Sequence, residues 1–419
     1  MKQARRSVVG QCVFAVLLPL LACGCGRPIV RHPVPVTLIN DARAPGMPPE
    51  IRAWGDQYSP EFERSLRQSI DQAKAAYGAH PPIDILALSG GGSQGAFGAG
   101  LLCGWTAAGN RPTFRVVTGI SAGAITAPFA FLGPKYDPQL KALATTVSDK
   151  DVFVLKDLLA ILGSDSIATT RPLEKLLDRY YDTSLLRAIA AEHAKGRRLY
   201  VATCNLDAQR PVIWDMGAIA SLGNAPEALK LFRRVILASA AIPVYFPPVY
   251  IQVEAGGKKY DEMHVDGGTI DQVILYGEAV TGERMLSASD DPPPPPPTGG
   301  HRPNVYIIRN AKIAPEPTDV RPALTSIADR AVATMTKAEG VGDLYRIYSV
   351  THREGLEFKL AYLPDDFDAG HVDDSEGFDQ KLMAQLFDLA YRLGRAGYRW
   401  HTEPPYWEIG KPPASNTTR

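Results

Sequence analysis

The stretch SGGGSQGAFGAG, Ser89 to Gly100, holds six glycines in twelve residues and directly follows the apolar run Ile83–Leu88. Glycine is costly in regular structure and is used where the backbone needs a positive φ or approaches another group closely. The loop therefore predicts a backbone that presents its own N–H groups. These groups would bind either a phosphate at a helix N-terminus or a negative oxygen that forms during a reaction.

The spacing of the glycines argues against a phosphate site. A P-loop needs a lysine followed by serine or threonine at a fixed distance, and neither stands there. The dinucleotide pattern G-x-G-x-x-G fits Gly90, Gly92 and Gly95, but the acidic residue expected about 20 positions later is missing. A close-packed turn between a strand and a helix is the structural alternative.

A second motif, G-x-S-x-G at Gly119–Gly123, stands between an apolar strand and a helix. This context is typical of a nucleophile elbow and predicts Ser121 as the nucleophile. Two strand ends about 30 residues apart fit neighbouring parallel strands of one right-handed βαβ unit. We therefore expect the N–H groups of Gly90, Gly91 and Gly92 to lie beside Ser121 and form an oxyanion hole.

Strands and helices alternate along most of the chain, which predicts a three-layer α/β/α fold with a mainly parallel central sheet. Strands are expected at 83–88, 114–119, 199–204, 212–214, 249–253, 260–265, 305–309 and 356–363, and helices at 95–108, from 121, and at 138–148, 172–181, 227–238, 323–348 and 376–395. Before them, Ser59-Pro60-Glu61 should open a helix. Its expected apolar face consists of Phe62, Leu66, Ile70, Ala73 and Tyr77.

Composition excludes several classes of function. The chain of 419 residues has 45 basic and 45 acidic residues, so no charge excess indicates a nucleic-acid partner. Its five cysteines are too few for a disulfide framework and their spacing makes no zinc site. No carboxylate cluster is evident in the sequence, and we expect neither a metal nor a cofactor.

The N-terminus has the charged and apolar regions of a bacterial export signal, expected over residues 1–22. Its apolar run is too short to span a bilayer. The run ends in Leu20-Leu21-Ala22-Cys23, which is similar to a lipobox and predicts a lipid on Cys23. Cys25 is a weaker acceptor. The alternatives to lipidation are an ordinary cleaved signal and a retained anchor. We expect an exported protein that is anchored to a membrane of the bacterial envelope.

The predicted domain organisation places one large domain at 59–400. The proline-rich stretch 23–58 precedes it as a semi-rigid tether, and a tail follows at 401–419. Six consecutive prolines at 292–297 predict an exposed polyproline loop at 288–302 inside this domain.

With two further blocks, the sequence resembles the patatin-like phospholipases over about residues 83–310. The blocks are Asp266-Gly267-Gly268 and the alanine- and proline-rich segment 238–248. The resemblance implies hydrolysis of acyl esters in phospholipids or related lipids, with Asp266 as the base for Ser121 and no histidine. Gln94 stands where the family often has arginine, so the head-group preference of that family does not carry over.

A solvated aspartate, with a pKa of about 3.9, is a poor base for a hydroxyl group. Burial would raise the pKa of Asp266, whereas N–H donors from the glycines after it would lower it. The expected pKa lies below that of histidine, about 6.5, so activity should persist below the histidine range.

Two alternatives remain open at this point. The first is a Ser-His-Asp esterase, in which a histidine after Asp266 serves as base. The available residues are His301, His352, His371 and His401, and His264 shares a strand face with Asp266. The second is an envelope lipoprotein that keeps the fold and binds lipid or a partner protein without catalysis.

Overall fold

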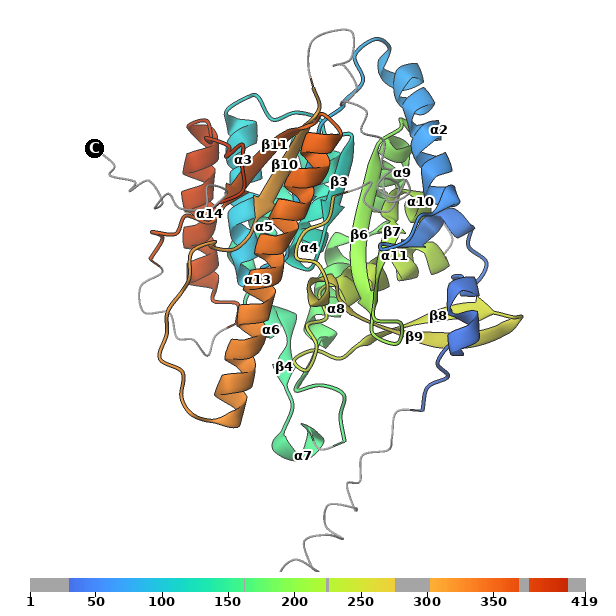
Figure 1. The fold of residues 1–419 in the computed structure, drawn as a ribbon, viewed down its shortest axis with the longest axis vertical. Helices are drawn as coiled ribbons and strands as arrows, with labels where there is room; N and C mark the ends of the chain where they lie inside the picture. Colours follow the sequence, from blue (N-terminus) through green and yellow to red (C-terminus); the bar gives the residue numbers. More distant parts are fainter. Residues whose placement is uncertain (1–29, 162, 224–225, 276–301, 369–376, 406–419) are drawn as a thin grey trace, which may run out of the picture.

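The computed structural model describes residues 30–161, 163–223, 226–275, 302–368 and 377–405. In this part of the chain a nine-stranded sheet has the order β1-β7-β6-β3-β2-β10-β11, and β9 pairs with β6 and β8 (Figure 1). The strands are β1 (Arg52–Trp54), β2 (Ile85–Leu88), β3 (Val116–Gly119), β6 (Arg198–Asn205), β7 (Arg210–Asp215), β8 (Val249–Ala255), β9 (Lys258–Asp266), β10 (Asn304–Arg309) and β11 (Glu357–Tyr362). A separate hairpin joins β4 (Val154–Leu155) to β5 (Ala168–Thr169).

The helices that cover the sheet agree closely with the sequence-based expectation. They are α2 (Pro60–Tyr77), α3 (Gly95–Ala107), α4 (Ala122–Leu132), α5 (Asp137–Thr146), α6 (Asp149–Val152), α7 (Leu158–Ile161), α8 (Arg171–Tyr180), α9 (Thr183–Ala194), α10 (Met216–Ser221), α11 (Pro226–Ser239), α13 (Leu324–Arg353) and α14 (Gln380–Arg395). Of these, α6, α7, α9 and α10 were not predicted from the sequence. None of the described helices combines the length and apolar character needed to cross a lipid bilayer.

The sheet is mixed, with its parallel part in one block. β6, β3, β2, β10 and β11 are parallel neighbours, whereas β1, β7, β8 and β9 pair antiparallel. The expected βαβ unit is present, because β2 and β3 pair directly.

Alternating side chains of β2 divide the core into two layers. Leu86 and Leu88 belong to a cluster with residues of α3, α4, α5 and α14. Ala87 faces the other way and packs with Leu344 and Ile347 of α13, which lies in front of the sheet in Figure 1. Helices therefore cover both faces, as the three-layer prediction requires.

The tether predicted for residues 23–58 does not hold over residues 34–54. Val34 and Ala42 are buried against Val253 of β8, and β1 pairs antiparallel with β7. Proline content indicates an extended backbone, but it does not reveal that such a backbone has a strand to pair with. Residues 23–29, the signal region 1–22, most of the predicted loop 288–302 and the tail from 406 lie outside the described residues.

The buried face of α2 also differs from the expected one. Phe62, Ser65, Ser69 and Ala73 are buried, whereas Ile70 is 40% exposed. Two arginines bond to these buried serines: Arg198 of β6 donates to Ser65, and Arg115, which directly precedes β3, donates to Ser69. The apolar pattern alone could not show these polar partners.

Candidate active site

Ser121 lies in a sharp turn between β3 and α4, with φ +55° and ψ −121°. The flanking glycines permit this turn. A Cβ atom on Gly119 would lie 2.5 Å from the carbonyl oxygen of Gly123, and one on Gly123 would lie 2.3 Å from that of Leu88. Only residues without a side chain fit this approach of helix, turn and strand, which accounts for the G-x-S-x-G spacing.

Ser239 fixes the backbone of this turn. The N–H of Ser121 donates to Ser239 Oγ at 3.0 Å, and that hydroxyl donates to the carbonyl of Ala202 at 2.7 Å. Ser239 is fully buried at the end of α11. It lies in the segment 238–248 noted in the sequence, but no pattern had singled out this residue.

The position of Asp266 follows from how β9 joins the sheet. β7 occupies one edge of β6, so β3 and β9 share the other edge. β3 pairs up to Gly119 with Val201, and β9 ends with Asp266 opposite Thr203. The C-terminal ends of β3 and β9 therefore meet. This brings Asp266 beside Ser121, the second residue after β3.

Asp266 is buried beside Ser121. The Ser121 hydroxyl lies close enough to the carboxylate of Asp266 to lower its pKa, and this carboxylate also accepts a hydrogen bond from the N–H of Gly268 at 2.7 Å. Burial raises the pKa of Asp266 to about 7, against the lowering effect of these two donors. The expectation of a pKa below the histidine range is therefore wrong, because desolvation of the charged form exceeds the effect of the hydrogen bonds.

The glycine loop is held against the end of β10. A Cβ on Gly91, which has φ +150°, would lie 2.2 Å from the carbonyl oxygen of Asn310. Asn310 also bonds Ser89 on both sides, through its N–H to Oγ at 2.8 Å and through its side-chain amide to the carbonyl at 2.9 Å. These contacts fix the loop beside Ser121, and a Cβ on Gly90 would lie 3.2 Å from the Cβ of that serine.

The N–H groups of the three loop glycines are not equivalent. The N–H of Gly90 donates to the carbonyl of Gln272 at 3.0 Å, so it is already engaged. Among the described residues, none accepts a hydrogen bond from the N–H of Gly91 or Gly92. Of the three expected oxyanion donors, Gly91 and Gly92 therefore have N–H groups that are available for a further acceptor. Gln94 is half-buried in the short 3-10 helix that follows.

An apolar pocket opens beside Ser121. The space in the pocket and at its mouth, open solvent included, amounts to about 700 Å³. Its walls come from α3, α4, α5, α8 and the segment after α11, and they include Ile125, Leu173 and Phe246. Phe378 and Met383 complete it, so the last part of the chain contributes to the site. A pocket of this composition fits a hydrocarbon chain.

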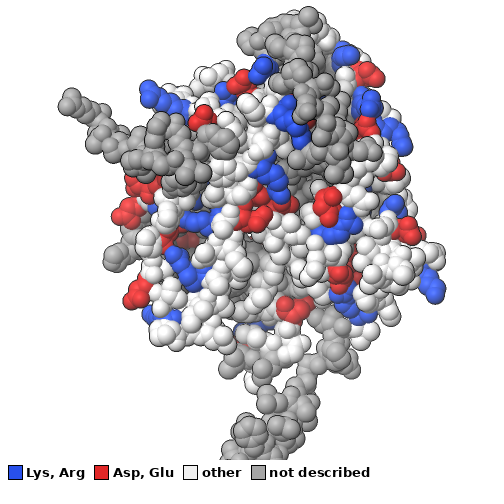
Figure 2. Space-filling model, viewed as in Figure 1, with Lys and Arg blue, Asp and Glu red and all other residues white. Residues whose placement is uncertain are grey.

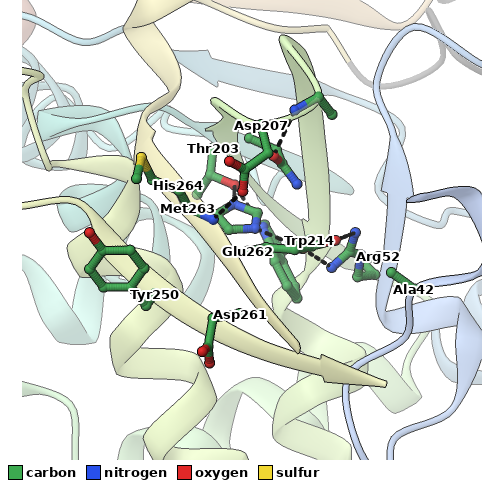
Figure 3. A network of polar contacts seen from close by, with 12 residues as sticks. Ala42, Arg52, Thr203, Asp207, Trp214, Tyr250, Asp261, Glu262, Met263 and His264 are labelled. Carbon is green, nitrogen blue, oxygen red and sulfur yellow. Dashed lines mark hydrogen bonds and ion pairs between the residues drawn. The ribbon is translucent and has the colours of Figure 1, made fainter. Parts of the chain in front are cut away.

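His264 is engaged away from Ser121. It is fully buried, with Nδ1 2.9 Å from Thr203 Oγ1 and Nε2 3.0 Å from Glu262 Oε2. Glu262 in turn pairs with Arg52 at 2.6 Å (Figure 3). Burial lowers the pKa of His264, and both ring nitrogens have partners in this network. The ring therefore supports the sheet and has no contact with the Ser121 hydroxyl.

The other histidines that could complete a triad lie elsewhere or outside the described residues. His352 is in the last turn of α13, where the chain turns into the N-terminal end of β11. His401 pairs with Leu360 along the outer edge of the sheet. His301 and His371 lie outside the described residues.

Three carboxylates lie close together near Gln272, which bonds to the glycine loop. The sequence did not indicate this cluster. Oxygens of Asp271, Glu339 and Asp343 lie within 4.8 Å of one another. Arg346 pairs with Asp271 at 2.6 Å and with Asp343 at 2.7 Å. Asp343 also accepts the N–H groups of Gln272 and Val273, so this cluster holds the loop that carries Gln272 beside the glycines.

Comparison with known proteins matches part of the chain to one family. Residues 86–276, a little under half of the chain, match the model described as patatin-like phospholipase. The structure of VipD from Legionella pneumophila is similar at 12% identity with a TM-score of 0.32, over 75% of this chain and 67% of that one. The type III effector ExoU is similar at 15% identity with a TM-score of 0.18, over 77% and 55%. No curated protein matches the chain.

Proposed function

We propose that this protein hydrolyses acyl esters of phospholipids or related lipids with a Ser121/Asp266 dyad. The observation that carries the proposal is the buried carboxylate of Asp266 beside the hydroxyl of Ser121, which lies at the wall of an apolar pocket. The match of residues 86–276 to the patatin-like phospholipase model supports the substrate class. A pKa of about 7 for Asp266 suits a general base near neutral pH.

In the proposed mechanism, Asp266 accepts the proton of the Ser121 hydroxyl as its oxygen attacks the ester carbonyl. The N–H groups of Gly91 and Gly92 stabilise the negative oxygen of the tetrahedral intermediate. Asp266 then gives the proton to the leaving alcohol, and the C–O bond of the ester breaks. Water, deprotonated by Asp266, hydrolyses the acyl-enzyme and restores Ser121.

We also propose that the catalytic domain extends beyond the matched residues 86–276, from about Val34 to Trp400. Two features support this extent. β10 and Asn310 position the glycine loop, and Phe378 and Met383 line the pocket. Truncation before residue 304 should therefore abolish folding or activity.

We further propose that a lipid on Cys23 anchors the catalytic domain to a membrane of the bacterial envelope. The motif Leu20-Leu21-Ala22-Cys23 supports this proposal.

The test is a mass-spectrometric survey of products from a mixed lipid extract. The wild-type protein should release fatty acids and lysolipids. Ser121→Ala should release neither, and Ser349→Ala, an exposed serine on α13, should act like the wild type. Equal product formation by the Ser121→Ala protein would refute the proposal.

A further inference from the structure

Large apolar side chains lie exposed along the first half of α13. Leu324 is 86% exposed, and Ile327, Val332 and Met335 are each more than half exposed. At about 100° of rotation per residue, these four side chains fall within one face about 140° wide. We call these four residues the α13 face.

Three polar residues of the same helix segment bond to neighbouring parts of the protein, although most side chains of this segment are exposed. Asp329 accepts a hydrogen bond from the hydroxyl of Tyr245 at 2.6 Å. Arg330 donates to the carbonyl of Glu316, and Lys337 donates to that of Ala314 at 2.6 Å. A helix on a water-soluble protein normally buries its apolar side and exposes its charges. Here four large apolar side chains stay exposed on one face, which indicates that the α13 face meets something other than water.

A second exposed apolar group adjoins the α13 face. Leu155 of β4, Leu159 of α7 and Val244 are between 66% and 83% exposed. Backbone hydrogen bonds join these segments, because β4 pairs with β5 and the N–H groups of Ile167 and Ala168 donate to the carbonyls of Val244 and Tyr245. We call Leu155, Leu159 and Val244 the hairpin side.

The two groups form one end of the molecule. The bond from Tyr245 to Asp329 ties the hairpin side to α13. In Figure 1 the first half of α13, β4 and α7 lie together at the lower end, and Figure 2 shows mostly uncharged surface there. Val244 has φ +73°, a strained conformation for a β-branched residue, and this backbone holds its side chain in solvent.

The exposed groups are continuous with the pocket wall. Val152 and Phe246 both line the pocket. Val152 precedes β4 by two residues, and Phe246 directly follows Tyr245. The same chain segments therefore line the pocket and carry exposed apolar side chains beside it.

We propose that the α13 face and the hairpin side dock onto the surface of a phospholipid bilayer, with the pocket opening toward it. This inference rests on the proposed function, since an acyl chain can then pass from the bilayer into the pocket without crossing water. A bilayer also suits apolar residues spread over α13, β4, α7 and the loop of Val244, because lipid chains adapt to an uneven surface.

The first test places a reporter on the surface itself. In the full chain with Cys12, Cys23 and Cys25 replaced by serine and Ser121 by alanine, a single cysteine is introduced by Met335→Cys, Leu159→Cys or Ile70→Cys. Each is labelled with an environment-sensitive fluorophore; the native Cys103 and Cys204 are buried. Vesicles of phosphatidylcholine and phosphatidylglycerol should raise the emission severalfold at positions 335 and 159 and leave position 70 on α2 unchanged.

The second test measures the effect of charge. Ile327→Glu should lower vesicle partition by about tenfold or more, the size expected for removing one large apolar side chain from a lipid contact. The ratio of vesicle-lipid hydrolysis to hydrolysis of a water-soluble monomeric ester should fall to a similar extent. Ile70→Glu, at an exposed isoleucine on another helix, is the matched control and should change neither.

The outcomes separate this inference from the proposed function. The reporter needs no hydrolysis, so an emission change at positions 335 and 159 supports docking even if no ester is cleaved. Hydrolysis of the monomeric ester without an emission change would overturn docking and leave the proposed function standing. An emission change that depends on protein concentration without vesicles would assign the surface to a second copy of the chain and overturn docking on lipid.

Discussion

Replacing Asp266 with asparagine should stabilise the fold at pH 8 while removing activity. Burial raises the pKa of this carboxyl group from 3.8 to about 7 in the folded protein. A shift of about 3 units corresponds to at most about 4 kcal/mol, at 1.36 kcal/mol per unit. Asp266 is 4% exposed, so solvent screening removes little of this effect.

The sign follows from which state holds the proton more tightly. Since the folded-state pKa is the higher one, the contribution of Asp266 to stability is fully present below pH 3.8 and is lost as the pH rises through about 7. Asp266→Asn removes this loss and keeps the acceptor for the N–H of Gly268. The variant should therefore gain most over the wild type above pH 7 and little near pH 4.

Urea unfolding at pH 4.5 and pH 8, followed by circular dichroism, measures the gain. Asp71→Asn removes an exposed carboxylate on α2 and serves as control. The activity of the wild type should fall as the pH drops through about 7, because the base must be ionised. If Asp266→Asn were no more stable than the wild type at pH 8, the ionised Asp266 would not destabilise the fold. That result would refute the raised pKa.

Three further predictions concern the histidine, the oxyanion loop and the anchor. His264→Gln should change kcat on a monomeric ester by less than about tenfold, whereas a triad histidine would cost about 1,000-fold or more; steady-state kinetics of the folded protein decides between them. Gly91→Ala should lower kcat by about 100-fold or more, because its Cβ would meet the Asn310 carbonyl at 2.2 Å and displace an oxyanion donor; a normal kcat would remove Gly91 from the site. Cys23→Ala should abolish incorporation of labelled fatty acid in a bacterial host, and label that persists would point to Cys25.

The local parts of the site could be predicted from sequence because their constraints are short in range. Gly119 and Gly123 surround Ser121 within one turn, and strand length with glycine spacing predicted that β2 and β3 pair. The approach of Asp266 depends instead on the pairing of β9 with the far end of β6, opposite Thr203. No pattern of periodicity encodes such a pairing, and only the family resemblance indicated it.

The two wrong predictions, the tether and the pKa of Asp266, both depend on contacts between segments that lie far apart in the sequence. Residues 34–54 pack on the domain because β7 and β8 offer partners that composition does not show. The pKa of Asp266 depends on how completely the fold excludes water from it, which the residues around it in sequence do not determine. By contrast, α9 and α10 had a local signal that went unused, since Asp182 and Asp215 cap their N-termini.

The most direct test of the Ser121/Asp266 dyad is the rate and position of covalent labelling by a lipid-like fluorophosphonate, measured by peptide mass mapping. We predict a single adduct on Ser121 in the wild type and labelling at least about 100-fold slower in Asp266→Asn, since general-base assistance contributes about that much. An adduct on a different serine, or an undiminished labelling rate in Asp266→Asn, would contradict the dyad.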